Sequence, residues 1–141
     1  MTGGDIIVRT IARLMVPFLL LFGAYILLHG HLGAGGGFQA GIIFTSALIL
    51  AAIGRSRIEL RSRLAGSKLW ILGSAGAIIF GATGFLGIVS GGSFLQYSLF
   101  PLPFPDDAIH AILITIVEIG IGIAVSGMIC LVFLTITGRG E

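Results

Sequence analysis

Four long stretches of the chain consist almost entirely of apolar residues and have no polar side. They cover about residues 8–28, 38–54, 69–89 and 108–136. A surface helix or strand of a soluble protein mixes apolar with polar residues, because one side faces water. A helix of roughly 20 apolar residues crosses the hydrocarbon core of a bilayer. The pattern therefore predicts an all-α integral membrane protein with four transmembrane helices.

The composition supports this interpretation. Of 141 residues, 56% are hydrophobic, and only 8 Lys or Arg and 6 Asp or Glu are present. The mean hydropathy is +1.12. Four spans and their loops use up residues 1–141, so we expect a single membrane domain without an active site of its own. The few cations lie where membrane topology places them, which argues against nucleic acid as a partner.

Three polar or irregular segments separate the four stretches. Residues 29–37 read H-G-H-L-G-A-G-G-G, and glycines cost roughly 1 kcal/mol each within a helix, which predicts a tight non-helical turn. Residues 55–68 carry five cations and one anion and form a water-exposed loop. Residues 90–107 combine glycine pairs, aromatics and prolines, as expected of an interfacial loop. Its belt residues would be Tyr97, Phe100 and Phe104.

The distribution of charge predicts the orientation. With the amino terminus inside the cell, all eight cations fall on the cytoplasmic side, whereas Asp106 and Asp107 face outward. This agrees with the positive-inside rule and predicts that both termini are cytoplasmic.

Glu118 is the strongest candidate for a chemical role in this chain. It is the one acidic residue inside the fourth apolar stretch, and a carboxylate at the bilayer centre costs at least ~2.5 kcal/mol. It must be protonated, paired or exposed to water, which are the conditions of a proton or sodium relay. We expect a neighbouring chain to supply its partner. The structural alternative is a hydrogen bond to an adjacent helix.

The histidines are candidates for minor roles, and the single cysteine limits the possible covalent links. His110 lies eight residues before Glu118, about 12 Å away along a continuous helix, and is an auxiliary candidate for the ion or proton path. His29 and His31 can cap the carbonyl end of the first helix. No metal site is expected, because no Cys, Asp or Glu lies near these histidines. A single cysteine, Cys130, excludes an intrachain disulfide.

Small residues predict close contacts between helices. In the third stretch they recur every four residues, and in the fourth they surround Glu118. The residues concerned are Gly73, Ala77, Gly81, Gly120 and Gly127. The fourth stretch spans 29 residues, or about 43 Å, more than the ~30 Å hydrocarbon core. It must tilt, emerge from the bilayer, or break at Gly120 and Gly122.

One motif resembles a known family. The string H-G-H-L-G-A-G-G-G-F-Q-A-G, residues 29–41, is similar to the hallmark of the MnhB-like (MrpB-like) subunits of the Mrp-type multisubunit sodium/proton antiporters. The similarity extends to the four spans, the Pro-rich segment 101–105 and the E-I-G-I-G-I-A-V string that begins at Glu118. The chain departs from the family where Gly33 and Ala34 replace a common Thr-Pro.

The resemblance implies a non-catalytic subunit that packs beside larger antiporter subunits in a prokaryotic plasma membrane and supports sodium and proton transport and assembly. Glu118 and His110 would neighbour the ion path. The residues His29, His31, Gly35, Gly36, Gly37, Phe38 and Gln39 would form the structural turn.

The same module occurs in membrane-bound hydrogenases and related sulfur reductases. Any nickel–iron centre or iron–sulfur cluster would then belong to partner subunits, and this chain would hold no cofactor. Two alternatives remain: a structural scaffold without an ion site, and an independent small transporter or channel that acts as a homo-oligomer.

Overall fold

Four α-helices make up the described part of the structure. The computed structural model describes residues 3–30, 36–54, 66–96 and 105–138. The helices are α1 (Gly3–His29), α2 (Gly37–Ile53), α4 (Gly66–Val89) and α5 (Asp106–Gly138). Within the described residues there is no strand, and the predicted all-α fold is confirmed. His31, Gly35 and the aromatics Tyr97, Phe100 and Phe104 lie outside the described residues.

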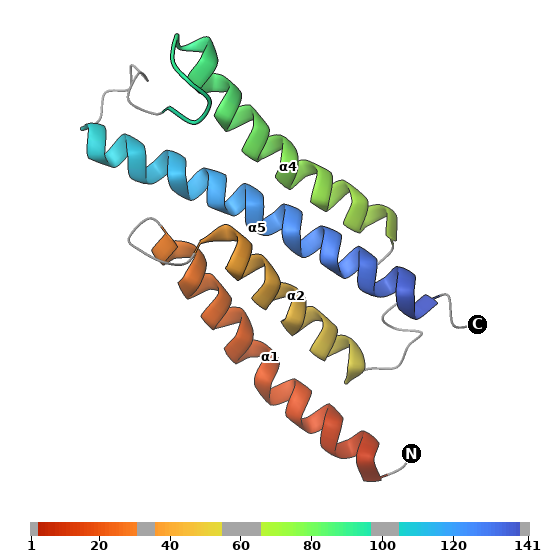
Figure 1. Ribbon diagram of the computed structural model, residues 1–141. Helices are drawn as coiled ribbons and strands as arrows, with labels where there is room; N and C mark the ends of the chain where they lie inside the picture. The colour runs from red at the N-terminus through yellow and green to blue at the C-terminus, as the bar shows by residue number, and fades with distance from the viewer. Residues whose placement is uncertain (1–2, 31–35, 55–65, 97–104, 139–141) are drawn as a thin grey trace.

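The helices form a row and not a closed bundle. α4 packs against α5, α5 against α2, and α2 against α1, while α1 touches α5 over a small area only. Figure 1 shows α4 and α1 on opposite flanks of the molecule. α5 therefore lies inside the row and contacts a neighbour on each side.

Three helices are long and apolar enough to cross a membrane. These segments, found among the described residues, are Ile6–His29, Gly66–Val89 and Asp107–Thr137. α2 has 17 residues, or about 25 Å of length, against the ~30 Å thickness of the hydrocarbon core. The fourth span thus stays a prediction for α2.

Three of the four helices are longer than the apolar stretches that predicted them, whereas α2 has 17 residues, as many as the stretch 38–54. α1 begins at Gly3, before residue 8, and α4 includes the end of the predicted basic loop. α5 runs unbroken for 33 residues, about 50 Å. The suggested break at Gly120 and Gly122 does not occur, because both glycines are covered by backbone of neighbouring helices.

α2 and α5 run side by side in the same direction, with a regular register. Methyl groups built on Gly37 and Gly41 would meet the backbone of Glu118 and Gly122, and the Thr45 hydroxyl donates to the Ser126 carbonyl. These three contacts follow one another every four residues on both helices. The register places the first turn of α2 beside Glu118, so α1 and α2 turn next to the middle of α5.

The C-terminal end of α4 is closed by a Schellman motif. Gly91 has a positive φ of 85°, its N–H donates to Ile88, and the N–H of Gly92 donates to Gly87. The turn then folds back on the helix, because Phe94 packs on Gly84 and lies edge-on to the Phe80 ring. The first part of the predicted loop 90–107 is therefore packed on α4.

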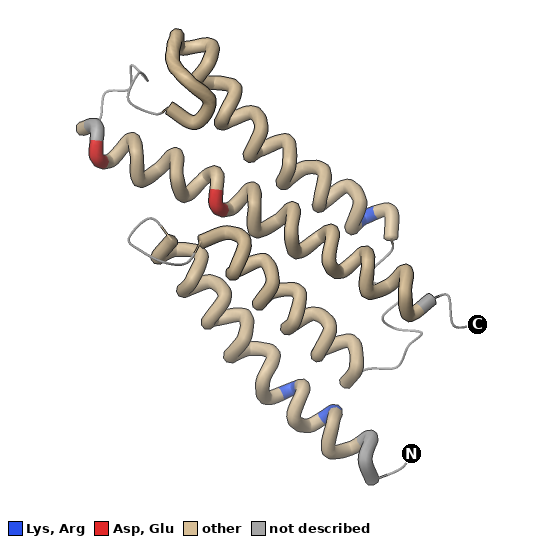
Figure 2. The backbone as a smooth tube through the Cα atoms, in the orientation of Figure 1, with Lys and Arg blue, Asp and Glu red and all other residues tan. Residues whose placement is uncertain are grey.

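The described charges separate along the molecule. Figure 2 shows the blue cationic positions of α1 and α4 toward the end that also holds both termini, and a red acidic position at the start of α5, at the other end. The described residues concerned are Arg9 and Arg13 of α1, Lys68 of α4 and Asp107 of α5. This arrangement matches the distribution that the sequence predicts. Which end faces the cytoplasm stays a prediction.

Candidate functional site around Glu118

Glu118 lies in the middle part of α5, beside the end of α1 and the start of α2. The side chain is partly buried, and its Oε2 atom is buried. Glu118 is the thirteenth residue of α5, and Figure 2 shows a red acidic position well inside this helix, apart from the red position at its start. The carboxyl group is therefore held within the protein.

Three glycines of the α1–α2 connection contact Glu118. A methyl group built on Gly30 would overlap both carboxyl oxygens, and one built on Gly36 would lie 2.9 Å from Oε1. A methyl group on Gly37 would overlap the carbonyl oxygen of Glu118 itself. The structure thus joins two features that are separate in the sequence, the glycine-rich turn and the intramembrane carboxyl group.

These contacts come from the same chain as Glu118. Gly30, Gly36 and Gly37 bring backbone close to Glu118, because a glycine has no side chain to keep it away. The sequence also predicts that a neighbouring chain supplies a partner for Glu118, and this stays a prediction.

The N-terminus of α2 has an unusual cap. Gly36 is the N-cap residue, with φ 105°, and it has no side chain to bond the first N–H groups of the helix. The first turn of α2 also holds no acidic residue. The N–H of Ala40 donates to the Gly36 carbonyl at 3.0 Å, which begins the helix. The positive end of the α2 dipole therefore lies beside the Glu118 carboxyl group.

His110 lies apart from this cluster. It is exposed on α5, eight residues before Glu118 on the same unbroken helix. The rise of the helix separates the two by about 12 Å. The two ion-path candidates are therefore about two helical turns apart along α5.

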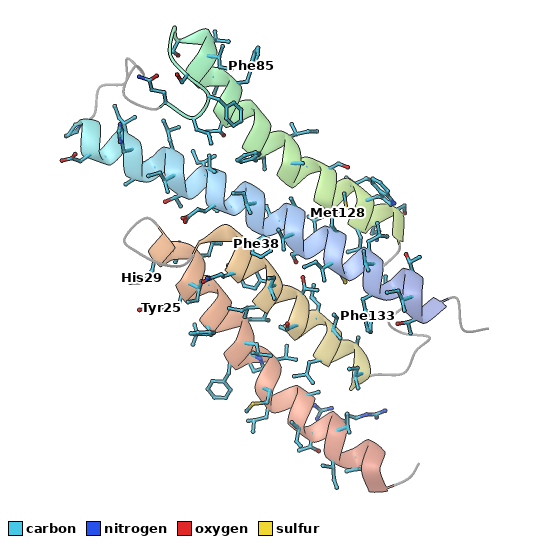
Figure 3. The ribbon with its side chains drawn as sticks, viewed as in Figure 1. Tyr25, His29, Phe38, Phe85, Met128 and Phe133 are labelled. Carbon is cyan, nitrogen blue, oxygen red and sulfur yellow. The ribbon has the colours of Figure 1, made fainter. Side chains whose placement is uncertain are left out.

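The described residues that were predicted to form the turn lie partly in the flanking helices, His29 in α1 and Phe38 and Gln39 in α2. His29 caps the end of α1, because its Nδ1 lies 3.2 Å from the Tyr25 carbonyl oxygen and its ring stacks on Tyr25 at 4.2 Å. Figure 3 shows this pair at the end of α1, with Phe38 at the start of α2. Phe38 and Gln39 are exposed in the first turn of α2.

The small residues of α4 and α5 form a tight interface, but not all the predicted ones take part. Gly73 lies against Gly127, and Gly120 packs on Ile79 and the Gly76 carbonyl oxygen. Ala77 is exposed, and a methyl group on Gly81 would have no neighbour within 4 Å. Within this chain Gly76 takes the place of these two residues. Their role in contacts with another chain stays a prediction.

Gly30 and Ser126 are contact residues that the sequence does not indicate, whereas it marks Thr45 only as a polar group just inside the second apolar stretch. Gly30 stands between two histidines, and nothing in the sequence indicates that it lies against a carboxyl group 88 positions later. Thr45 and Ser126 are buried polar residues inside apolar stretches, which is a signal for an interhelical hydrogen bond.

The described side chains hold no cluster of three or more His, Cys, Asp or Glu that could bind a metal ion. Cys130 is buried in α5 as a free thiol. The chemistry of the site therefore rests on one carboxyl group, backbone dipoles and the nearby helix ends.

Comparisons with known proteins add the family context. Residues 7–131 match the profile of a domain related to the MnhB subunit of Na+/H+ antiporters. A Staphylococcus haemolyticus protein with the assigned name antiporter subunit mnhB2 is 36% identical over 141 residues, which cover 98% of each chain. Proteins of the same name from Staphylococcus aureus strains MRSA252 and Newman are 35% and 36% identical, again over 98% of each chain.

Proposed function

Since the chain belongs to the family of MnhB-related Na+/H+ antiporter subunits, we propose that it is a non-catalytic subunit of a multisubunit antiporter and assembles there with other membrane subunits. It is a multi-pass protein of a prokaryotic plasma membrane. The observation that carries the proposal is the match to the relative from Staphylococcus haemolyticus, which covers 98% of this chain and 98% of the relative.

The proposed contribution to transport centres on Glu118. A carboxyl group inside an apolar helix is expensive in a membrane and is typically placed there for a purpose such as proton or ion transfer. Its partly buried position among the ends of two helices supports this role. His110, nearer the end of α5, would act as an auxiliary group on the route to the membrane surface.

Replacing Glu118 tests this role against the scaffold alternative. We expect Glu118→Gln to leave the complex assembled and to reduce Na+-dependent proton movement by at least tenfold in inverted membrane vesicles, because a neutral amide cannot carry a proton. Asp107→Asn is the matched control, since this carboxyl group is exposed at the end of α5. Normal transport by an assembled Glu118→Gln complex would support a scaffold without an ion site.

The larger complex is a separate question. We propose an antiporter, with the membrane arm of a hydrogenase-like or sulfur-reducing complex as the second context, in which nickel–iron and iron–sulfur groups reside in other subunits. Mild detergent extraction of the tagged chain, followed by identification of the copurifying subunits, separates these contexts. A chain that purifies alone and transports ions in liposomes would contradict the subunit proposal and support the homo-oligomeric alternative.

A further inference from the structure

The carboxyl group of Glu118 occupies the place of a missing helix cap. An N-cap residue normally offers a side-chain oxygen to the first N–H groups of its helix. Gly36, the N-cap of α2, has no side chain, and a methyl group built on it would lie 2.9 Å from Oε1 of Glu118. A carboxyl group from α5 thus lies where a capping side chain of α2 would begin.

Electrostatics favours this arrangement. The N-terminus of a helix carries a partial positive charge and unsatisfied N–H groups, which make it a favourable neighbour for a carboxylate. The first turn of α2 supplies no acid of its own. Inside a membrane, where water screens charges little, such a fixed dipole is worth more than at a protein surface.

Gly30, which follows the last residue of α1, also lies against the carboxyl group of Glu118. Its φ lies outside the positive range that favours glycine, so an alanine would fit the backbone there. The nearest obstacles to a methyl group are the two carboxyl oxygens and the carboxyl carbon of Glu118. Glycine at this position is therefore explained by the space that the carboxyl group occupies.

We infer that Gly30, Gly36 and Gly37 are positioning residues, whose bare backbone holds the Glu118 carboxyl group against the N-terminus of α2. The glycine-rich turn and the carboxyl group then act as one unit. The inference rests on the proposed function for its effect on transport, but the placement itself is tested independently by stability.

Gly30→Ala is the cleanest test, because its methyl group meets a side chain and no backbone. In the whole complex we expect a lower thermal midpoint for this subunit and a loss of transport on the order of 10- to 100-fold, as a misplacement of about 1 Å can cause. Gly66→Ala is the matched control, because a methyl group there meets only the Leu131 side chain, at an ordinary contact distance of 3.7 Å.

A second substitution distinguishes positioning from simple damage to α1. Glu118→Asp shortens the side chain by one methylene and withdraws the carboxyl group from the new methyl group. The double variant Gly30→Ala with Glu118→Asp should therefore be more stable than Gly30→Ala alone and should recover several-fold of its transport. A merely structural role of Gly30 at the end of α1 would not respond to the length of the side chain at position 118.

The two proposals fail in different ways. Normal stability of Gly30→Ala, or a double variant no better than Gly30→Ala, would overturn the positioning inference. Normal transport by Glu118→Gln would instead overturn the relay in the proposed function, and the stability of the double variant would still decide whether the glycines hold the carboxyl group.

Discussion

Thr45 links two apolar helices through a single hydroxyl group. Its side chain is 1% exposed, and its one hydroxyl proton is shared between the Gly41 carbonyl oxygen at 2.9 Å and the Ser126 carbonyl oxygen at 3.3 Å. The first bond stays within α2, whereas the second crosses to α5. Inside a bilayer water does not compete for such groups, and packing and hydrogen bonds drive helix association.

Thr45→Val removes the hydroxyl and keeps the shape of the side chain. We expect the free energy of unfolding to fall by about 0.6 kcal/mol, the average for interhelical hydrogen bonds in membranes. Titration of the detergent-solubilised protein with dodecyl sulfate, followed by circular dichroism, measures the change.

Thr135→Val is the control for this prediction. The Thr135 hydroxyl bonds only the Leu131 carbonyl of its own helix, at an exposed position. The two variants should therefore differ, and equal midpoints would show that the bond to Ser126 adds no stability.

At the scale of the helix, the glycine faces of α4 and α5 set how closely the two approach. A methyl group on Gly76 would overlap the Ala124 nitrogen and would lie 2.9 Å from the Ala124 Cα atom. These obstacles are backbone atoms, which cannot rotate away. Gly76 is buried in the interface, in contrast to the exposed Ala77 next to it.

Gly76→Ala should therefore push α4 away from α5 and cost about 1–3 kcal/mol of stability, the usual range for overpacking. Gly81→Ala should leave stability unchanged or raise it slightly, since alanine is the better helix former. Thermal denaturation of the two purified variants provides the comparison. A Gly76→Ala protein as stable as the wild type would rule out this close approach.

The sequence predicts the elements well and their contacts less well. Uninterrupted apolar stretches are a strong signal because a membrane helix must satisfy its own backbone, so the four helices are evident. Which side of a helix meets a neighbour is a weaker signal when every side is apolar. For this reason the spacing Gly73, Ala77, Gly81 suggested a face of which the α4–α5 contact uses only Gly73.

The candidate site was predictable only in its parts. Glu118 is evident as a charge in an apolar stretch, and the turn is evident from its glycines. Their contact depends on the register of α2 along α5, which is set by the packing of Gly37, Gly41 and Thr45. Such a register is a property of the folded chain and leaves no mark in local sequence.

For the whole molecule, the separation of charges leads to a prediction about topology. Lys68 lies at the end that holds the termini, and Asp107 lies at the opposite end, with both side chains exposed. In a Cys130→Ala background, a membrane-impermeant maleimide should label Asp107→Cys in intact cells. Lys68→Cys should react only after the membrane is made permeable, because positive charge is retained on the cytoplasmic side. The reverse labelling pattern would invert the orientation.

The described α1–α2 pair and the α4–α5 pair are offset from each other along the helix axes. α1 and α2 have their junction beside Glu118, whereas α5 extends from there to Asp106, about 18 Å further. Among the described residues, α1 and α2 lie on one side of α5 and α4 lies on the other. The two flanks of the chain therefore present different helices, so a neighbouring subunit that fits the α1 side does not fit the α4 side.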